Sequence, residues 1–363
     1  MTREKGGTSM KKLINKVDDV EREMIEGLAK AAPKKLRKLD EGNIIVRTPR
    51  KEGKVALVSG GGSGHEPMHS GYIGDGMLDG AVPGEIFTSP TPDQVLACAE
   101  AVDSGRGVLL IIKNYTGDVL NFETATELLH DMGHPVAVVL TDDDVAVKDS
   151  LYTAGRRGVA GTVLIEKLLG AAARRGDDLD SLAALGRKLN NHCHSIGIAL
   201  GACTVPAAGK PSFTLADNEI EYGVGIHGEP GIERRPYTDL DTVVGQMFGT
   251  LIEHGAYSRP LRQWNRDTAS WDEETVAKTP LQAGDRVIAM VNNLGSVPLS
   301  ECYGVYHRLA QACAANGITI ARSLVGSYCT SLDMQGVSIT LLAVDDDTLA
   351  LYDAPVHTPA LNW

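Results

Sequence analysis

Short runs of β-branched and other hydrophobic residues alternate along the chain with longer segments whose hydrophobic residues recur at helical spacing. The runs predict β-strands, and several of the segments between them predict α-helices. Because strands and helices alternate, we predict an α/β protein whose first half holds a largely parallel sheet flanked by helices. The predicted strands cover residues 55–59, 108–112, 135–140, 196–200, 219–226, 286–291, 318–324 and 337–344.

Several predicted helices carry recognisable end signals. Thr91, Pro92 and Gln94 supply an N-cap, a proline at the first helical position and the glutamine of a capping box. Asn121 is predicted to cap a helix over residues 122–132. The other predicted helices begin at Lys11 and at Thr238, and one covers residues 298–316.

The length of 363 residues suggests two domains of ordinary size. We predict two α/β domains, the first over residues 10–190 and the second, with a mixed sheet, over residues 191–363. The last ~25 residues are free to return to the first domain. A polar stretch over residues 262–280 is predicted to form an exposed excursion, which Trp264 and Trp271 fasten to the rest of the protein.

Composition and charge narrow the possible functions. The chain has 35 basic and 47 acidic residues, a net charge of −12, which disfavours nucleic acid or an anionic membrane as a direct partner. No apolar run approaches the roughly 18 residues of a membrane span. Residues 1–9, predicted to be a frayed extension, lack the apolar segment of a signal peptide. Six scattered cysteines without a Cys-x-x-Cys motif predict reduced thiols and a cytoplasmic location.

The sharpest local motif joins a hydrophobic strand to four glycines within residues 60–64, followed by His65. Glycines there let backbone N–H groups approach a ligand that side chains would block. A nucleotide loop is disfavoured, because no Gly-Lys-Ser/Thr follows and because His65 and Pro67 break the Gly-x-Gly-x-x-Gly register. A tight strand-to-helix turn is the alternative, but it needs fewer glycines. The motif favours a loop that holds a small polar ligand.

Two further motifs place polar side chains at predicted strand ends. Lys113 and Asp118 follow the strand over residues 108–112, at the edge where open α/β sheets bind ligands, although from this segment alone a solvated loop is the better explanation. His227 follows the strand over residues 219–226 and is flanked by glycines. A lone histidine is more often structural, but the match with His65 makes a ligand-binding role about as good an explanation.

Weaker candidates involve possible metal ligands. The aspartates at 142–144 and 345–347 follow strands and could suggest Mg²⁺, but carboxylates at strand exits are more often solvated or capping groups. His192 and His194 would share one face of a strand, and nothing nearby completes a tetrahedral zinc set. We therefore predict no metal site.

Four segments together carry a family resemblance. They are residues 59–67, the stretch 83–92, residues 113–118 leading into 121–123, and residues 224–231. With them the chain resembles, from residue 10 to residue 363, the separate K subunit family of the bacterial phosphoenolpyruvate-dependent dihydroxyacetone kinases. Single-chain ATP-dependent relatives in that family carry an additional nucleotide-binding helical domain, for which this sequence shows no counterpart.

The resemblance implies a substrate and roles for particular residues. In the family, a histidine ring nitrogen adds to the ketone carbon of dihydroxyacetone and gives a hemiaminal, and the matching residue is His227. The residue that matches the base for phosphoryl transfer is His65, and Asp118 matches an essential carboxylate that could share or perform this proton transfer. The residues that match the remaining substrate contacts are Gly62, Ser63, Gly64 and Lys113.

The resemblance also implies partners. ADP or ATP with Mg²⁺ belongs to a partner L subunit, which a multiphosphoryl M protein of the phosphotransferase system rephosphorylates. This chain would bind no cofactor itself and would form a homodimer. Two alternatives stay open: a ketone-sensing co-activator that acts on a transcription regulator without catalysis, and a nucleotide-dependent enzyme that acts alone. The presence of His65, Lys113, Asp118 and His227 favours the kinase subunit.

Overall fold

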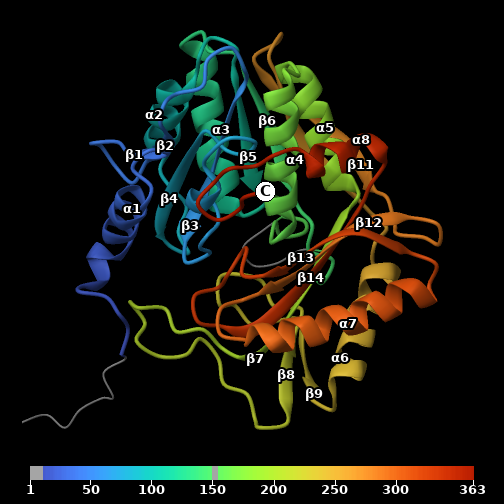
Figure 1. Ribbon diagram of the computed structural model, residues 1–363. Coiled ribbons are helices and arrows are strands. Elements are labelled where there is room, and N and C mark those ends of the chain that lie inside the picture. Colours follow the sequence, from blue (N-terminus) through green and yellow to red (C-terminus); the bar gives the residue numbers. More distant parts are fainter. Residues whose placement is uncertain (1–10, 149–153) are drawn as a thin grey trace, which may run out of the picture.

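The computed structural model describes residues 11–148 and 154–363, and within them two β-sheets lie one above the other (Figure 1). The predicted frayed extension over residues 1–9 lies outside the described residues. Both sheets have six strands, and helices pack against each of them. The predicted α/β fold, with one parallel-rich and one mixed sheet, is confirmed. The division into two domains at residue 190 stays a prediction.

The first sheet has the strand order β1-β2-β4-β3-β5-β6. Strands β4, β3, β5 and β6 pair in parallel, and only the short edge strands β1 and β2 run antiparallel to their neighbours. The carboxyl ends of the parallel strands therefore meet at one edge. The strands are β1 (Leu36–Lys38), β2 (Ile45–Arg47), β3 (Ala56–Ser63), β4 (Gly80–Ile86), β5 (Val108–Lys113) and β6 (Val136–Thr141).

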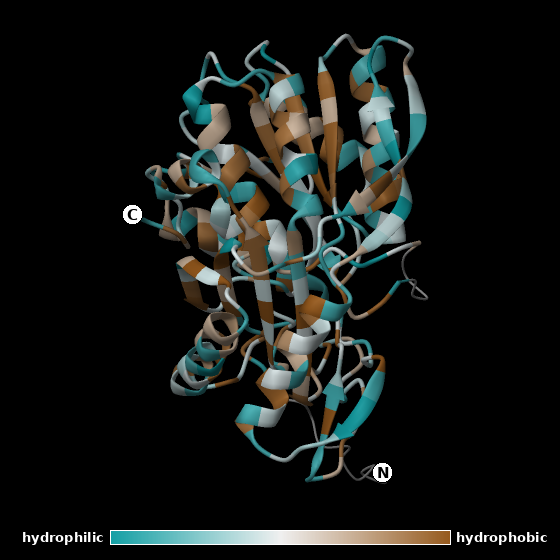
Figure 2. Ribbon diagram, turned by 90° about the vertical axis from the view of Figure 1, so that its right-hand side faces the viewer, coloured by the Kyte–Doolittle hydropathy of each residue, from teal (hydrophilic) through white to brown (hydrophobic). Residues whose placement is uncertain are grey.

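Helices bury both faces of this sheet. Successive side chains of a strand point to opposite faces, so Leu110 of β5 packs towards α2 and α3, whereas Leu109 and Ile111 pack towards α4. Figure 2 shows these hydrophobic strands enclosed by helices whose outer faces are hydrophilic. The helices are α1 (Val20–Ala31) after the turn η1 (Val17–Asp19), α2 (Pro92–Val102), α3 (Thr116–Asp131), α4 (Gly161–Arg175) and α5 (Leu179–Asn191).

The second sheet has the order β13-β12-β14-β7-β8-β9 and pairs in parallel only between β12 and β13. Helices α6 (Leu240–Glu253) and α7 (Leu299–Ala315) cover one face, and the other face shares a hydrophobic cluster with the first sheet. The strands are β7 (Cys193–Gly201), β8 (Glu219–Tyr222), β9 (Glu233–Pro236), β12 (Arg286–Asn293), β13 (Thr319–Gly326) and β14 (Gln335–Ala343).

The polar stretch after α6 forms a regular antiparallel hairpin of β10 (Tyr257–Asn265) and β11 (Ser270–Lys278). Trp264 and Trp271 face each other across the hairpin with ring centroids 5.2 Å apart. The Trp271 Nε1 atom donates a hydrogen bond of 2.8 Å to Glu127 in α3. Trp264 contacts the ring of His130 in α3, with centroids 5.4 Å apart, so the predicted fastening by two tryptophans is confirmed, but the stretch is an ordered hairpin.

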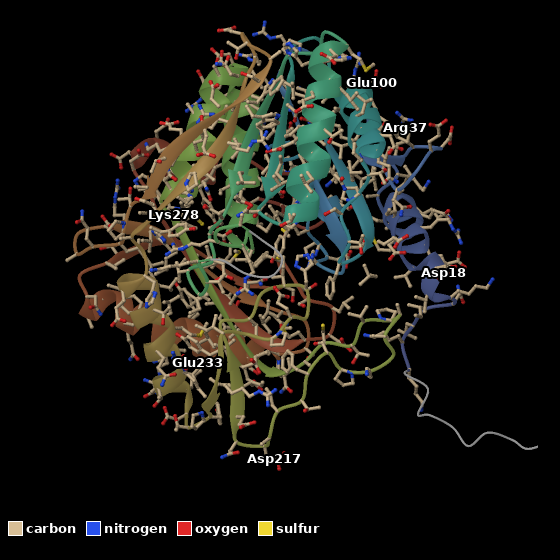
Figure 3. The ribbon with its side chains drawn as sticks, turned by 180° about the vertical axis from the view of Figure 1, so that it is seen from behind. Asp18, Arg37, Glu100, Asp217, Glu233 and Lys278 are labelled. Atoms are coloured by element: carbon tan, nitrogen blue, oxygen red, sulfur yellow. The ribbon has the colours of Figure 1, made fainter. Side chains whose placement is uncertain are left out.

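The aspartates at 142–144 lie buried where the two sheets meet. Asp142 forms ion pairs with Arg259 and Lys278, at 2.6 and 2.8 Å, and Figure 3 places Lys278 in this middle layer of the protein. Asp144 pairs with Arg157. These carboxylates are neither solvated nor grouped for a cation, and the described residues contain no cluster of three or more potential metal ligands.

Several predicted element boundaries are wrong, and three of them show why. The first helical turn begins at Val17, because the segment before it reaches across to the second half, where Lys12 pairs with Asp333. Helix α3 begins at Thr116, five residues before Asn121, and the carbonyl of Tyr115 accepts its first helical bond. Strand β8 ends at Tyr222, because the next residue, a glycine, has φ +72° and turns the chain. The capping box before α2 is confirmed.

The chain returns to the first sheet at its carboxyl end. Helix α8 (Asp346–Asp353) packs against α4, and His357 and Ala360 donate backbone hydrogen bonds to Asp75 and Gly71 beside the turn η2 (Ser70–Tyr72). All six cysteines are buried and unpaired. Among the described residues, none of the helices has the length and apolarity needed to cross a bilayer.

Candidate functional site

A cavity of about 780 Å³ opens where the carboxyl ends of β3 and β5 meet the loop that follows β8. Both halves of the chain line it. The first half contributes Gly62, Phe87, Thr88, Ser89, Tyr115, Thr116, Gly117, Asp118 and Asn121, and the second half contributes Ser212, His227, Gly228, Glu229 and Pro230.

The glycine run forms the second half of strand β3, so its prediction as a loop is wrong. Glycine suits this strand because neighbouring backbone lies directly against it. A Cβ on Gly62 would lie 2.6 Å from Phe87 Cα and Thr88 N. The Ser63 hydroxyl donates a hydrogen bond of 2.6 Å to Gly84 in β4. Of the three predicted backbone contacts, only Gly62 lines the cavity, and the contacts of Ser63 and Gly64 with substrate stay a prediction.

The two glycine-flanked histidines meet across the boundary between the halves. The Nε2 atoms of His65 and His227 lie 3.2 Å apart. The Nδ1 atom of His65 lies 2.9 Å from the carbonyl oxygen of Thr330, which can only accept, so Nδ1 carries the proton. His65 Nε2 is then an acceptor, and His227 Nε2 donates to it. The remaining ring nitrogen of His227, Nδ1, is buried and has no hydrogen-bond partner among the residues that the structure describes.

Both imidazoles are neutral at physiological pH. Burial, the largest cause, and the nearby cations Lys113 and Arg157 together lower the pKa of His227 from 6.5 to about 3. Burial likewise holds the pKa of His65 well below its ordinary value, and His227 and Lys113 add to the effect. A neutral imidazole keeps a lone pair for nucleophilic attack or proton transfer, whereas a protonated one does not.

Two aromatic rings hold the histidine pair in place. Phe87 stacks on His65 with ring centroids 5.2 Å apart and meets the edge of His227 at 5.3 Å. Tyr115 contacts His227 edge-on at 4.2 Å. Sequence reasoning did not single out these rings. Both lie inside segments that carry the family resemblance, but no local pattern indicates which histidine each ring would contact.

A buried ion-pair network holds the loop that carries His227. The backbone N–H of His227 donates a hydrogen bond of 2.7 Å to Glu229, and Arg157 contacts the other oxygen of this carboxylate at 3.3 Å. Arg157 also donates to the carbonyl of Gly223, at 2.8 Å, and pairs with Asp144. The arginine thus ties both ends of the loop to the first half of the chain. Sequence reasoning missed Arg157 and Glu229.

Asp118 lies at the start of α3, where the positive end of the helix dipole favours a carboxylate. Ser89 donates a hydrogen bond to its Oδ1 atom. The Lys113 Nζ atom lies 3.5 Å from its Oδ2 atom. Lys113 is fully buried and does not line the cavity, so its predicted contact with substrate stays a prediction. The cavity walls thus bring together His227 and Asp118, with His65 directly behind His227.

The Dak1 domain family matches residues 26–360 of this chain. The chain belongs to the Dak1 family. It is 70% identical over 354 residues to the dihydroxyacetone-binding subunit DhaK of the PEP-dependent dihydroxyacetone kinase of Escherichia coli, covering 98% of this chain and 99% of that protein. It is also 40% identical to human triokinase/FMN cyclase, over 97% of this chain but 58% of the human protein.

Solved structures agree with this membership. The dihydroxyacetone kinase operon co-activator Dha-DhaQ has a TM-score of 0.82 at 32% identity and covers 95% of this Dak1 chain and 98% of its own. The C. freundii dihydroxyacetone kinase in complex with AMP-PNP and Mg²⁺ also has a TM-score of 0.82 at 32% identity, over 98% of this chain and 61% of that chain. The Dak1 fold therefore occurs both in kinases and in a co-activator.

The Dak1 site combines three chemical abilities. His227 offers a neutral nucleophile at the cavity wall, and His65 offers a proton acceptor 3.2 Å behind it. Asp118 offers a carboxylate at the same cavity. Such a set suits addition to a carbonyl followed by proton removal from a hydroxyl.

Proposed function

We propose that this chain is the dihydroxyacetone-binding subunit of a dihydroxyacetone kinase. It captures dihydroxyacetone covalently on His227 as a hemiaminal and presents a terminal hydroxyl to a phosphoryl donor on a partner L subunit. The observation that carries this proposal is a histidine held neutral by burial, with a pKa of about 3, in the wall of a cavity that also holds Asp118. The Dak1 membership and the similarity to a dihydroxyacetone-binding subunit support the substrate.

In the capture step, a lone pair of the His227 ring forms a bond to the carbonyl carbon, and the C=O π electrons move onto the oxygen. The alkoxide gains a proton and the ring loses its N–H proton, so the sum is one proton transfer from nitrogen to oxygen. His65 is placed to accept the ring proton, because its Nε2 atom lies 3.2 Å from His227 Nε2, and water in the open cavity supplies the proton that the alkoxide gains. The adduct requires a carbonyl, so glycerol, of similar size, is excluded.

In the transfer step, the captured triose holds a terminal hydroxyl near Asp118. This carboxylate accepts the hydroxyl proton, alone or shared with His65, while the oxygen attacks the transferred phosphoryl group. ATP with Mg²⁺ on the L subunit supplies that group: its β–γ phosphoanhydride bond breaks and ADP is the leaving group. The M protein then rephosphorylates the ADP, with phosphoenolpyruvate as the ultimate donor. Positioning provides most of the catalysis of such a transfer, so it can be divided between two chains.

Two measurements test the proposal together. The chain, an L subunit, the M protein with its phosphotransferase partners and phosphoenolpyruvate should convert dihydroxyacetone into dihydroxyacetone phosphate. With the chain alone and dihydroxyacetone labelled with ¹³C at the carbonyl, the ketone ¹³C resonance should move to the region of tetrahedral carbon. The kinase function is wrong if the first mixture yields no product, and the hemiaminal is wrong if the bound ketone resonance stays unchanged.

The second candidate is a co-activator that binds the ketone and contacts a transcription regulator, as the Dha-DhaQ similarity suggests. Product formation in the reconstituted mixture distinguishes the two, since a co-activator without catalysis gives none. The kinase proposal also implies a homodimer in the cytoplasm, and sedimentation of the purified chain tests the dimer.

A further inference from the structure

The ammonium of Lys113 is buried among three acceptors. Its Nζ atom donates to the carbonyl of Gly60 at 3.2 Å, lies 3.0 Å from His69 Nε2 and lies 3.5 Å from Asp118 Oδ2. Space for it exists only because residue 61 is glycine, where a Cβ would lie 2.1 Å from Nζ. An ammonium has donors only, so His69 must present the lone pair of its Nε2 atom.

The other ring nitrogen of His69, Nδ1, faces two acceptors and therefore carries the proton of the ring. Its Nδ1 atom lies 2.5 Å from the Glu166 carboxylate and 3.0 Å from the Ser59 hydroxyl. Ser59 already donates its own proton to the carbonyl of Ile111, at 2.8 Å, so both oxygens are acceptors towards Nδ1. His69 is therefore the Nδ1–H tautomer. Burial, the largest cause, lowers its pKa and keeps the ring neutral.

Among the described residues, the Glu166 side chain forms no hydrogen bond or ion pair other than that with His69. It lies in α4, on the opposite face of the first sheet from α3 and Asp118 (Figure 1). Its side chain is fully buried, and within residues 11–148 and 154–363 its Oε2 atom has no hydrogen-bond partner. A buried carboxylate is costly unless it is paired, and the partner here is His69. The carboxylate increases the electron density at the far nitrogen of that ring and so strengthens its bond with Lys113.

We infer that Glu166 and His69 are positioning residues for the kinase reaction, which hold the Lys113 ammonium back from Asp118 so that this carboxylate keeps an oxygen for the substrate hydroxyl. This inference rests on the proposed function. Without the His69 acceptor, the ammonium loses one of its partners and moves onto Asp118, its nearest anion. The carboxylate then becomes a weaker and misplaced proton acceptor, whereas His227 stays neutral, because burial is the main cause of its lowered pKa.

The inference therefore predicts that loss of this positioning slows phosphoryl transfer but leaves the capture step unchanged. Capture of dihydroxyacetone on His227 should continue at the wild-type level, and KM for dihydroxyacetone should change little. The turnover number kcat should fall by roughly 10- to 100-fold, since small misplacements of a catalytic group have effects of this size.

A matched pair of substitutions at residue 69 tests the inference. In His69→Gln, the amide lies near the position of Nε2 and can still accept from Lys113. In His69→Asn, the shorter amide lies near the position of Nδ1 and meets Glu166 only. We expect His69→Asn to lose roughly 10- to 100-fold in kcat and His69→Gln to recover most of that loss. Ser59→Ala, which removes a neighbour of the ring that does not touch Lys113, should keep kcat within about twofold.

Glu166→Gln supplies an independent arm if the variants at residue 69 do not fold. It preserves the shape and one acceptor but removes the charge, and kcat should fall about tenfold while the ¹³C signal of the adduct keeps its wild-type intensity. Equal activity of His69→Gln and His69→Asn, a loss in Ser59→Ala as large as theirs, or unchanged kcat in Glu166→Gln would overturn the inference. If the wild-type chain itself gives neither adduct nor product, the proposed function fails and not the positioning.

Discussion

The Nε2 atoms of His65 and His227 lie 3.2 Å apart, although the two histidines follow strands of different sheets. The carbonyl of Thr330 fixes the proton of His65 on Nδ1, which leaves His65 Nε2 as an acceptor towards His227. The two rings are therefore aligned for a proton transfer between their Nε2 atoms.

Replacement of His227 should abolish capture. In His227→Ala, no ring nitrogen remains at the cavity wall, so the tetrahedral ¹³C signal should disappear and kcat/KM should fall by at least about 1000-fold. His307→Ala, an exposed histidine on α7, is the matched control and should behave as wild type. An adduct that forms in His227→Ala would place the covalent bond on another residue.

Asp118→Asn should separate capture from transfer. The amide cannot accept the hydroxyl proton, so kcat should fall by about 100- to 10,000-fold, the range typical of a lost general base. The adduct on His227 should form normally. Asp131→Asn, at the exposed end of the same helix, should leave kcat unchanged. If Asp118→Asn turns over like wild type, His65 alone performs the proton transfer.

Acid should destabilise the fold through its buried histidines. Burial lowers the pKa of His227 and of His194 from 6.5 to about 3. Between these values the unfolded chain binds protons that the folded chain does not, so the free energy of unfolding should decrease as the pH falls, by about 1.4 kcal/mol per pH unit for each such group. Above pH 6.5 these imidazoles are neutral in both the folded and the unfolded chain, so the folded chain keeps all of the free energy of unfolding that acid would remove.

Urea unfolding at a series of pH values between 4.5 and 7.5 measures this slope. His194→Gln removes one of the titrating groups and should reduce the slope by about 1.4 kcal/mol per pH unit. An unchanged slope in that variant would mean that His194 is already protonated in the folded chain.

Gly62→Ala should distort the cavity wall. The added Cβ would lie 2.6 Å from backbone atoms of Phe87 and Thr88, which cannot move aside as a flexible side chain would. We expect a loss of about 1–3 kcal/mol in stability, as for other overpacked sites, together with weaker capture of dihydroxyacetone. Gly249→Ala in α6 meets no atoms within 4 Å and should stabilise by about 0.5–1 kcal/mol. Thermal unfolding and the ¹³C signal compare the two.

Local signals predicted local structure well. The capping box of Thr91 and Gln94 depends on residues three apart, and the structure contains it. Asn121 does not cap a helix as predicted, because its side chain instead donates to the carbonyl of Pro90, 31 residues earlier in the chain. A side chain with a distant partner gives no end signal in its own segment, so the start of α3 could not be predicted from this residue.

In the candidate site, too, local signals could be recognised in the sequence, whereas contacts between distant segments could not. Glycine spacing and strand-end positions, together with the family resemblance, pointed to His65, Asp118 and His227. The residues that hold them, such as Arg157 and Glu229, were missed because their contacts join segments 72 residues apart. Arg157 lies outside the motifs that the sequence analysis singled out, and Glu229, although it lies within residues 224–231, shows no local pattern that indicates a buried partner.

The pairing of one histidine from each sheet constrains how the chain can vary over evolutionary time. If one half were exchanged for that of a distant relative, the chain could still fold and yet lose function, because the seam between the halves, with the hydrophobic cluster that they share, sets the alignment of the two rings. Crossovers near the middle of the gene should therefore survive only when both sides of that seam come from compatible parents, whereas substitutions on the outer helices remain free to drift.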